Sequence, residues 1–308
     1  MGDRIVVTGG AGFLGSYVVR KLESRGYEVS VPRSSKYDLR RRSAVYKMYE
    51  DFEPNAVIHL AAQCGGIGIN QKKPASFLYD NAVMGLELMD AAVARVQKFV
   101  QVGTVCSYPK FTPVPFKESD IHNGYPEETN APYGLAKKLL LTAAQSYRQQ
   151  YGLNSIYLIP VNLYGPQDNF NPFTSHVIPA LIRKCVEAHE KDLPSINIWG
   201  TGSASREFLY VEDAADAIVA AYEKYDGAEP VNIGSGEEIN IAALAHLIAT
   251  TVGFTGKFIF DPTKPDGQPR RCLDITRAQQ EFGFTASVNL REGLRRTIAW
   301  YQSSSRDK

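Results

Sequence analysis

Three glycines near the N-terminus, Gly9, Gly12 and Gly15, constrain the fold of this chain more than any other feature. They follow a β-branched run at residues 5–7 and lead directly into an amphipathic segment, after which residues 27–31 form a second β-like run. In such a strand–turn–helix–strand unit, backbone N–H groups at the helix N-terminus can approach a pyrophosphate because no Cβ atom blocks the way. Both flanks fit that unit, so the glycines favour a dinucleotide site over an ordinary glycine-rich turn.

The rest of the first half continues the alternation of strands and helices. Three apolar runs are typical of strands that are buried on both faces, and helical segments separate them. We therefore expect an α/β fold with a Rossmann-type, doubly wound parallel sheet. The expected strands are residues 55–60, 98–102 and 154–161, and the expected helices are residues 43–52, 74–94 and 131–151.

The alternation breaks after residue 165, which predicts a smaller, mixed C-terminal substrate domain. The elements expected there are a helix at 176–190, a short strand at 196–199, and helices at 241–252 and 290–303. We expect this domain to cover the carboxyl edge of the sheet, where ligands of open α/β sheets bind. The expected division is a dinucleotide-binding domain of residues 1–165, with a return at about 204–234, and a substrate-binding domain of residues 166–203 and 235–308.

The composition indicates the class of protein. The chain has 308 residues, of which 44% are hydrophobic and 22% charged, as in ordinary soluble domains. A formal net charge of +1 gives no sign of a nucleic acid or membrane partner. The four cysteines lie far apart without C-x-x-C pairing, so we predict a reducing compartment and no metal site. With no signal peptide and no apolar run of transmembrane length in view, we expect a cytoplasmic protein.

The end of the second β-like run bears on the choice of cofactor. It carries Arg33, followed by Ser34 and Ser35, and no acid appears before Asp38. At this place an acid binds the 2′-hydroxyl of NAD, whereas an arginine accommodates the 2′-phosphate of NADP. The sequence therefore favours NADP, in its reduced form NADPH, over NAD. A solvated basic loop is the alternative, since charge clusters in loops are commonly surface.

Tyr133, Lys137 and Thr104 form the candidate group for proton transfer. Tyr133 and Lys137 are four residues apart on one expected helix, so their side chains share a face, and Thr104 follows an expected strand. A phenol that exchanges a proton near neutral pH needs its pKa lowered from about 10, and a neighbouring ammonium has that effect. A hydroxyl such as that of Thr104 would hold the substrate oxygen in line. We therefore expect Lys137 to lower the pKa of Tyr133.

With these residues the chain resembles the extended short-chain dehydrogenases/reductases over nearly its whole length. Within that superfamily it is most similar to the GDP-L-fucose synthases, which are GDP-4-keto-6-deoxy-D-mannose 3,5-epimerase/4-reductases. The matching segments are residues 65–67, 106–110, 162–170, 175–181, 199–202, 206–213 and 264–267. Three features depart from the pattern. Thr104 stands in place of the more usual serine, Arg271 stands in place of a lysine, and residues 118–130 differ from the expected sequence.

The resemblance implies roles for individual residues. Cys106 and His176 would be the acid/base pair of epimerisation, joining Thr104, Tyr133 and Lys137 as catalytic residues. Ser175 is the expected N-cap of the helix after His176. The implied substrate-binding residues are Asn162, Val177, Arg183, Trp199, Arg206, Asp266 and Arg271. The cofactor-binding residues expected are Gly9, Gly12, Phe13, Leu14, Gly15, Arg33, Asp38, Leu39, Leu60, Ala61, Ala62, Tyr133, Lys137, Val161, Asn162 and His176.

Each of these roles also has a structural alternative. Cys106 could be a small buried residue, His176 a helix-terminal histidine, and Arg183 and Arg206 members of surface ion pairs. The other cysteines, Cys64, Cys185 and Cys272, are interpreted as structural.

The resemblance predicts an NADP-dependent epimerase/reductase. Its expected substrate is a nucleotide-diphosphate sugar that is GDP-linked, a GDP-4-keto-6-deoxy-hexose. It also implies a homodimer through the helices at 75–94 and 131–151. Open alternatives are an epimerase without net reduction, a 4-keto reductase without epimerisation, and a non-catalytic NADP-binding regulator.

Overall fold

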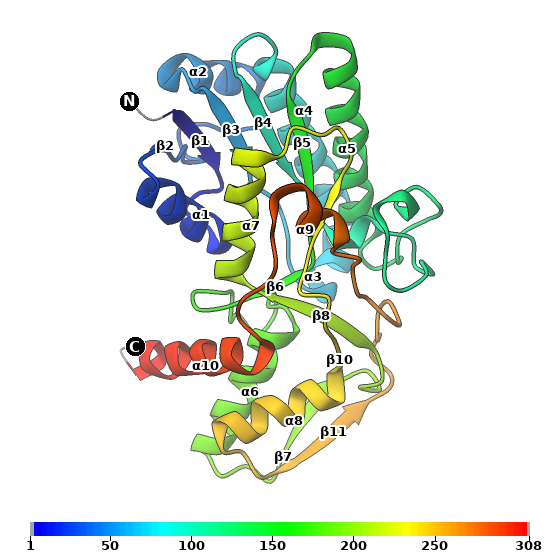
Figure 1. Ribbon diagram of the computed structural model, residues 1–308. Helices are drawn as coiled ribbons and strands as arrows, with labels where there is room; N and C mark the ends of the chain where they lie inside the picture. The colour runs from blue at the N-terminus through cyan, green and yellow to red at the C-terminus, as the bar shows by residue number, and fades with distance from the viewer. Residues whose placement is uncertain (1–2, 307–308) are drawn as a thin grey trace.

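The computed structural model describes residues 3–306, and a six-stranded parallel sheet forms its centre (Figure 1). The strand order is β2-β1-β3-β4-β5-β9, and every neighbouring pair is parallel. The strands are β1 (Arg4–Thr8), β2 (Glu28–Ser30), β3 (Ala56–His59), β4 (Lys98–Val102), β5 (Ser155–Pro160) and β9 (Val231–Ile233). This sheet confirms the predicted Rossmann-type fold.

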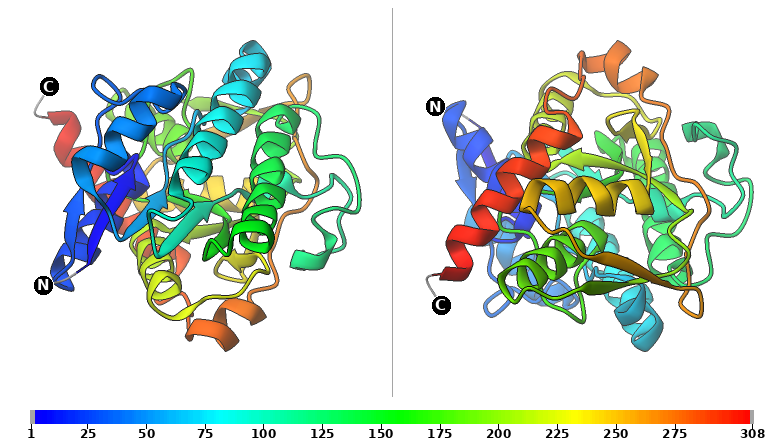
Figure 2. Two further views of the ribbon diagram at one scale, coloured as in Figure 1. Left: turned by 90° about the horizontal axis from the view of Figure 1, so that it is seen from above. Right: turned by 90° about the horizontal axis from the view of Figure 1, so that it is seen from below.

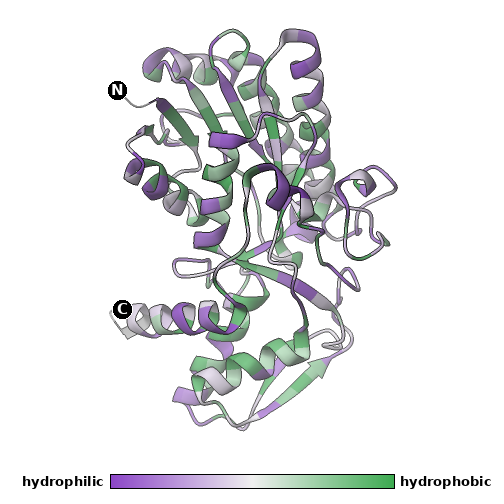
Figure 3. Ribbon diagram, viewed as in Figure 1, coloured by the Kyte–Doolittle hydropathy of each residue, from purple (hydrophilic) through white to green (hydrophobic). Residues whose placement is uncertain are grey.

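Helices cover both faces of the sheet, which explains why β3, β4 and β5 are buried at every residue (Figure 2). One face carries α1 (Phe13–Ser24) and α7 (Val211–Lys224), which pack on each other. The other carries α2 (Arg42–Phe52), α4 (Pro74–Ala92) and α5 (Ala131–Tyr151), and α5 contacts α4 along its length. Figure 3 shows the apolar residues gathered on the strands, with polar residues on the outer helix surfaces.

A second hydrophobic core lies below the carboxyl edge of the central sheet. It includes a three-stranded sheet of β10 (Glu238–Asn240), β8 (Ser205–Tyr210) and β6 (Asn162–Tyr164), and a parallel pair of β11 (Lys257–Asp261) and β7 (Ser195–Trp199). Its helices are α6 (Val177–Glu190), α8 (Ile241–Val252) and α10 (Leu290–Arg306). The strand and helices predicted in this half are present, and among residues 3–306 no helix is long and apolar enough to cross a membrane.

Several short elements were not predicted, among them β6, which follows β5 almost directly. The glycine-rich loop after β3 contains α3 (Ile67–Lys72), and the last quarter of the chain adds β10, β11 and α9 (Thr276–Phe282). The 3-10 turns η1 (Val105–Ser107) and η2 (Glu118–Asp120) follow β4. The expected N-cap Ser175 was wrong by one residue, because His176 occupies that position and caps no N–H with its side chain.

Packing crosses the predicted division of the chain at two places. Leu273 and Phe282 belong to the core of the central sheet, although they lie beyond residue 235, and Phe208 belongs to the second core. The two-domain division remains a prediction.

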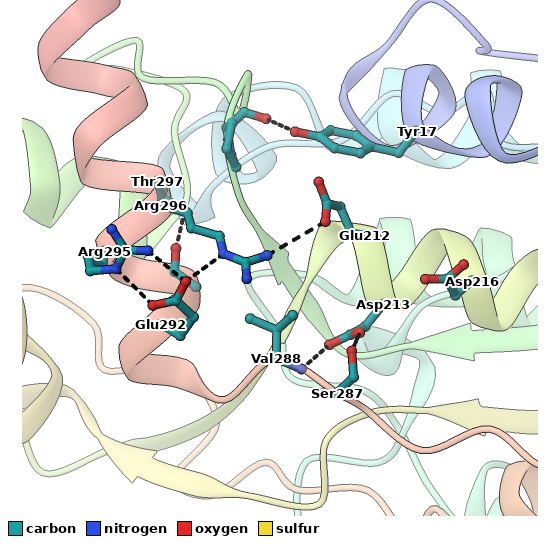
Figure 4. A network of polar contacts seen from close by, with 12 residues as sticks. Tyr17, Glu212, Asp213, Asp216, Ser287, Val288, Glu292, Arg295, Arg296 and Thr297 are labelled. Atoms are coloured by element: carbon teal, nitrogen blue, oxygen red, sulfur yellow. Dashed lines mark hydrogen bonds and ion pairs between the residues drawn. The ribbon is translucent and has the colours of Figure 1, made fainter.

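Polar contacts at the start of α7 connect the two cores (Figure 4). The buried carboxylate of Asp213 accepts hydrogen bonds from Ser287 Oγ at 2.7 Å and from the N–H of Val288 at 2.9 Å. Arg296 on α10 contacts Glu292 at 2.7 Å and Glu212 at 3.8 Å. These contacts fix the segment that leads into α10 against the first turn of α7.

Candidate active site

A cavity of about 1260 Å³ lies between the carboxyl edge of the central sheet and the second core. Every site residue predicted from the sequence lines it, from Gly9 and Arg33 at one end to Arg183 and Trp199 at the other. The chain thus brings together in one space residues as far apart in sequence as Gly9 and Arg271.

The glycine turn fits the diphosphate of a dinucleotide. A Cβ at Gly9, where φ is +73°, would lie 2.7 Å from the N of Ala61, and one at Gly15 would lie 2.1 Å from the Gly9 carbonyl oxygen. These two glycines therefore allow backbone to pack on backbone. Gly12 faces the cavity with more room and is the N-cap of α1, where no side chain caps the first N–H groups. Free N–H donors at a helix N-terminus favour an anion in the cavity.

The surroundings of Arg33 also suit a phosphate. Arg33 is exposed at the cavity and takes part in none of the ion pairs between residues 3 and 306, whereas Arg40 pairs with Asp38 at 2.9 Å. The hydrogen bonds from Arg40 lower the pKa of Asp38 to about 2. Asp38 is therefore neutralised by its neighbour, and the unpaired cation at this end is Arg33.

Close packing of α5 on η1 sets the position of Tyr133 beside Thr104. A Cβ at Gly134 would lie 2.2 Å from the carbonyl oxygen of Cys106, so only glycine allows this approach. Burial raises the pKa of Tyr133 well above 10, while a hydrogen bond with Thr104 opposes the shift. The phenol is consequently protonated at neutral pH and can donate to a substrate oxygen.

Lys137 is 2% exposed, and its Nζ donates to the carbonyl oxygen of Val102 at 2.9 Å. Burial lowers the pKa of Lys137 to about 8. The expected lowering of the Tyr133 pKa was wrong, because desolvation of the phenol in this enclosed site outweighs any favourable charge.

Cys106 and His176 face the same cavity from η1 and from the start of α6. The N–H of Cys106 donates to Thr104 Oγ1 at 3.2 Å, and Arg271 Nη1 lies 3.6 Å from Cys106 Sγ. Desolvation and then the positive charge of Arg271 lower the pKa of His176. The imidazole is therefore more readily neutral than a free histidine, contrary to the imidazolium that an acid role at neutral pH would need.

The far end of the cavity carries two arginines suited to a diphosphate. The Nε of Arg183 is buried without a hydrogen-bond partner, and its Nη1 lies 3.3 Å from Glu187. Arg206 donates to the carbonyl oxygens of Ser205 at 2.7 Å and Asp266 at 2.9 Å, and burial lowers its pKa to about 9. Arg206 takes part in none of the ion pairs of the described residues, and the Nε of Arg183 is unpartnered beside its contact with Glu187, so both groups favour an anionic ligand.

Three other predicted substrate-binding residues, Trp199, Asp266 and Asn162, line the same cavity and differ in their contacts. Trp199 is 55% exposed and presents its ring to the ammonium of Lys264 at 5.6 Å. The carboxylate of Asp266 accepts from the N–H and Oγ1 of Thr201 at 2.8 and 2.9 Å, so it holds the loop after Trp199. Asn162 donates from Nδ2 to the Glu207 carbonyl oxygen at 2.9 Å.

Among the lining residues outside the predicted set, Cys64 and Asp168 carry ionisable side chains close to the predicted residues. Cys64, interpreted as structural, lies on the cavity wall and interacts electrostatically with Tyr133 and Lys137. Asp168 also lines the cavity, with Oδ2 buried and unpartnered, and burial raises its pKa to about 7. The position of Cys64 in the loop after β3 was the available signal. Within residues 3–306 no group of three or more His, Cys, Asp or Glu side chains could hold a metal ion.

Comparisons with known proteins agree with this geometry. A family model described as "NAD dependent epimerase/dehydratase family" matches residues 5–242. The chain is 42% identical to a probable GDP-L-fucose synthase 1 of Oryza sativa subsp. japonica over 97% of this chain and 92% of that one. The structure is similar to a GDP-6-OMe-4-keto-L-xylo-heptose reductase from C. jejuni, with a TM-score of 0.91, 27% identity and 98% of each chain covered. A GDP-L-fucose synthetase from Naegleria fowleri bound to NADP gives a TM-score of 0.88 at 28% identity, with 99% and 95% covered. The chain belongs to the NAD-dependent epimerase/dehydratase family.

Proposed function

We propose that this protein is an NADPH-dependent epimerase/reductase that converts a GDP-4-keto-6-deoxy-hexose to GDP-L-fucose or a related sugar. One observation carries the proposal: the dinucleotide turn, the proton-transfer residues and the arginines Arg183 and Arg206 line a single cavity. The 42% identity to a probable GDP-L-fucose synthase supports the choice of sugar. The NADP in the similar Naegleria structure and the unpaired Arg33 support the choice of cofactor.

The chemistry of a 4-keto sugar gives each catalytic residue a task. Hydrogens on C3 and C5 are α to the carbonyl, so their removal leaves an enolate, and inversion needs a proton acceptor and a proton donor on opposite faces of the ring. Cys106 and His176 would supply these two groups. Tyr133, protonated at neutral pH, and Thr104 would hold the C4 oxygen while negative charge develops on it.

The reduction uses the same contacts. The first turn of α1, Arg33 and Lys137 would hold the dinucleotide, which supplies hydride to C4 when it is bound. Tyr133 would then give its proton to the C4 oxygen. Because Lys137 titrates near pH 8, its charge is available to balance this transfer at neutral pH.

The direct test is the oxidation of NADPH with GDP-4-keto-6-deoxymannose in deuterated water. We expect NADPH consumption, with solvent deuterium at C3 and C5 of the product. No consumption, combined with a detectable sugar epimer, would instead identify an epimerase without net reduction.

A 4-keto reductase without epimerisation is the second candidate. The similar C. jejuni structure is described as a reductase, and the lowered pKa of His176 removes the ready imidazolium. In the same experiment this candidate predicts NADPH consumption and a product without deuterium at C3 and C5.

A homodimer through α4 and α5 forms part of the proposal. These neighbouring helices expose the large apolar side chains Leu78 and Tyr79 on α4, and Leu139 and Tyr151 on α5. Exposed apolar side chains on two packed helices are suited to a subunit interface. Residence in the cytoplasm is also proposed, and fractionation of the source cells tests it.

A further inference from the structure

Arg271 is a buried guanidinium that no carboxylate neutralises. It is 5% exposed and takes part in none of the salt bridges between the residues that the structure describes. A buried cation without a counter-ion is costly, so an anion is expected beside it during function. The atom within reach that can become an anion is the sulfur of Cys106, 3.6 Å from Nη1.

Hydrogen bonds hold the guanidinium in this position. Nε donates to Gln268 Oε1 at 3.1 Å, and Nη1 also donates to Asn162 Oδ1 at 3.3 Å. Gln268 is itself 2% exposed, and its Nε2 donates to two backbone carbonyls in the segment after η1 at 3.0 and 3.1 Å. The planar guanidinium therefore cannot turn toward the diphosphate end of the cavity without breaking this set.

The backbone of Arg271 is fixed as well. Its carbonyl oxygen accepts from the N–H of Glu207 on β8 at 2.9 Å, and the Glu207 carboxylate accepts from the N–H of Leu273 at 2.7 Å. Hydrogen bonds thus hold both the backbone and the guanidinium of Arg271, and its Nη1 is directed at the sulfur of Cys106.

We propose that Arg271 is the counter-ion of the Cys106 thiolate, rather than a ligand of the substrate diphosphate. This inference rests on the proposed function for the identity of the step. In that step the thiolate accepts a proton from a carbon beside the carbonyl. The electron pair of the C–H bond becomes the enolate, with its charge on the C4 oxygen, and the sulfur becomes a neutral thiol. Arg271 transfers no proton; its charge-assisted contact stabilises the sulfur while it is an anion.

Other groups also act on this thiol. Tyr133 from α5, Cys64 from the loop after β3 and Arg206 from β8 interact electrostatically with Cys106. Arg206 is the only other cation among these, and its Nη1 and Nη2 donate to backbone carbonyls. Arg271 thus directs an N–H at the sulfur, whereas the hydrogen bonds of Arg206 go to carbonyl oxygens.

The test is the rate of Cys106 alkylation by iodoacetamide as a function of pH, followed by mass spectrometry of the Cys106 peptide in ligand-free protein. A Cys64→Ser background removes the second thiol of the cavity. We expect Arg271→Met to slow alkylation at pH 7 roughly tenfold, because the thiolate loses its counter-ion. Arg271→Lys, which keeps the charge, should restore most of the rate.

Arg270→Met is the matched control, because Arg270 is the preceding residue, is exposed and pairs with Glu238. Its alkylation profile should equal that of the parent protein. Unchanged profiles in Arg271→Met, or an equal shift in Arg270→Met, would overturn the inference. If Arg271→Met does not fold, Arg271→Gln removes the charge and retains polar contacts, and the same outcomes apply. Alkylation needs no substrate, so a failed NADPH assay would refute the proposed function without deciding this result.

Discussion

Burial of a single ammonium group, that of Lys137, lowers the free energy of unfolding of the whole protein. Burial lowers its pKa from 10.5 to about 8, so between these values the unfolded chain binds the proton more tightly and stability rises with pH. At pH 7 the difference amounts to about 3 kcal/mol against the folded state. We expect Lys137→Met to increase the free energy of unfolding by up to about that amount at pH 7 and to abolish reduction.

Urea denaturation at pH 7 and pH 9.5 measures this effect. The gain in the free energy of unfolding should shrink by roughly half at pH 9.5. At that pH the folded protein has lost the Lys137 proton, and only the unfolded chain's remaining affinity for it opposes folding. Lys191→Met, which replaces an exposed lysine, is the control and should change stability little. A Lys137→Met protein that is less stable than the parent at pH 7 would contradict the argument.

The sequence was a good guide to which residues meet and a poor one to their charge states. The predicted site residues all line one cavity, because most of them follow a strand or begin a helix at the same edge of the sheet. The rise in the Tyr133 pKa depends on burial by segments distant in sequence, and the Arg271–Cys106 contact joins positions 165 residues apart. Neither follows from local spacing.

The same distinction holds at the scale of elements. The strands β3, β4 and β5 each carry their own apolar run, and α5 ends at Gly152, where φ is +68°, so local sequence predicts them. The three residues of β10 are a strand only because they pair with β8, and β11 pairs with β7 some sixty positions earlier. Such elements are set by tertiary pairing and have no local signature.

Glu207 shows how one side chain holds several elements together. Its carboxylate is fully buried and accepts from the N–H groups of Ser235, Gly236 and Leu273 at 2.5, 2.7 and 2.7 Å. Glu207→Gln keeps the shape but turns an NH₂ group toward N–H donors, so we expect a loss of about 2 to 3 kcal/mol in the free energy of unfolding. Urea denaturation measures it.

Glu237→Gln is a suitable control for that experiment, since it makes the same chemical change at an exposed residue directly before β10, the strand that pairs with β8. We expect it to leave stability nearly unchanged. Equal stability of Glu207→Gln and the parent protein would show that the buried carboxylate is not needed to hold these segments together.

At the scale of the whole molecule, the surface of α4 and α5 gives the remaining prediction. Leu139 is 46% exposed on α5, close to helix α4 with its exposed Leu78 and Tyr79. If these side chains form the homodimer interface, a charge at its centre must be buried without a partner, which is costly. We expect Leu139→Asp to convert a dimer into a monomer of the 34.1 kDa chain mass, measured by light scattering after size-exclusion chromatography.

Leu193→Asp is the matched control for the dimer. Leu193 is 44% exposed, close to the 46% of Leu139, but it lies between α6 and β7, next to the second core. The same charge placed there should leave the dimer intact, because neither α4 nor α5 is touched. A parent protein that is monomeric, or a dimer that survives Leu139→Asp, would remove this face as the interface. Loss of the dimer in both variants would point to a general effect of the charge. Only a monomeric Leu139→Asp protein beside a dimeric Leu193→Asp protein therefore supports an interface formed by α4 and α5.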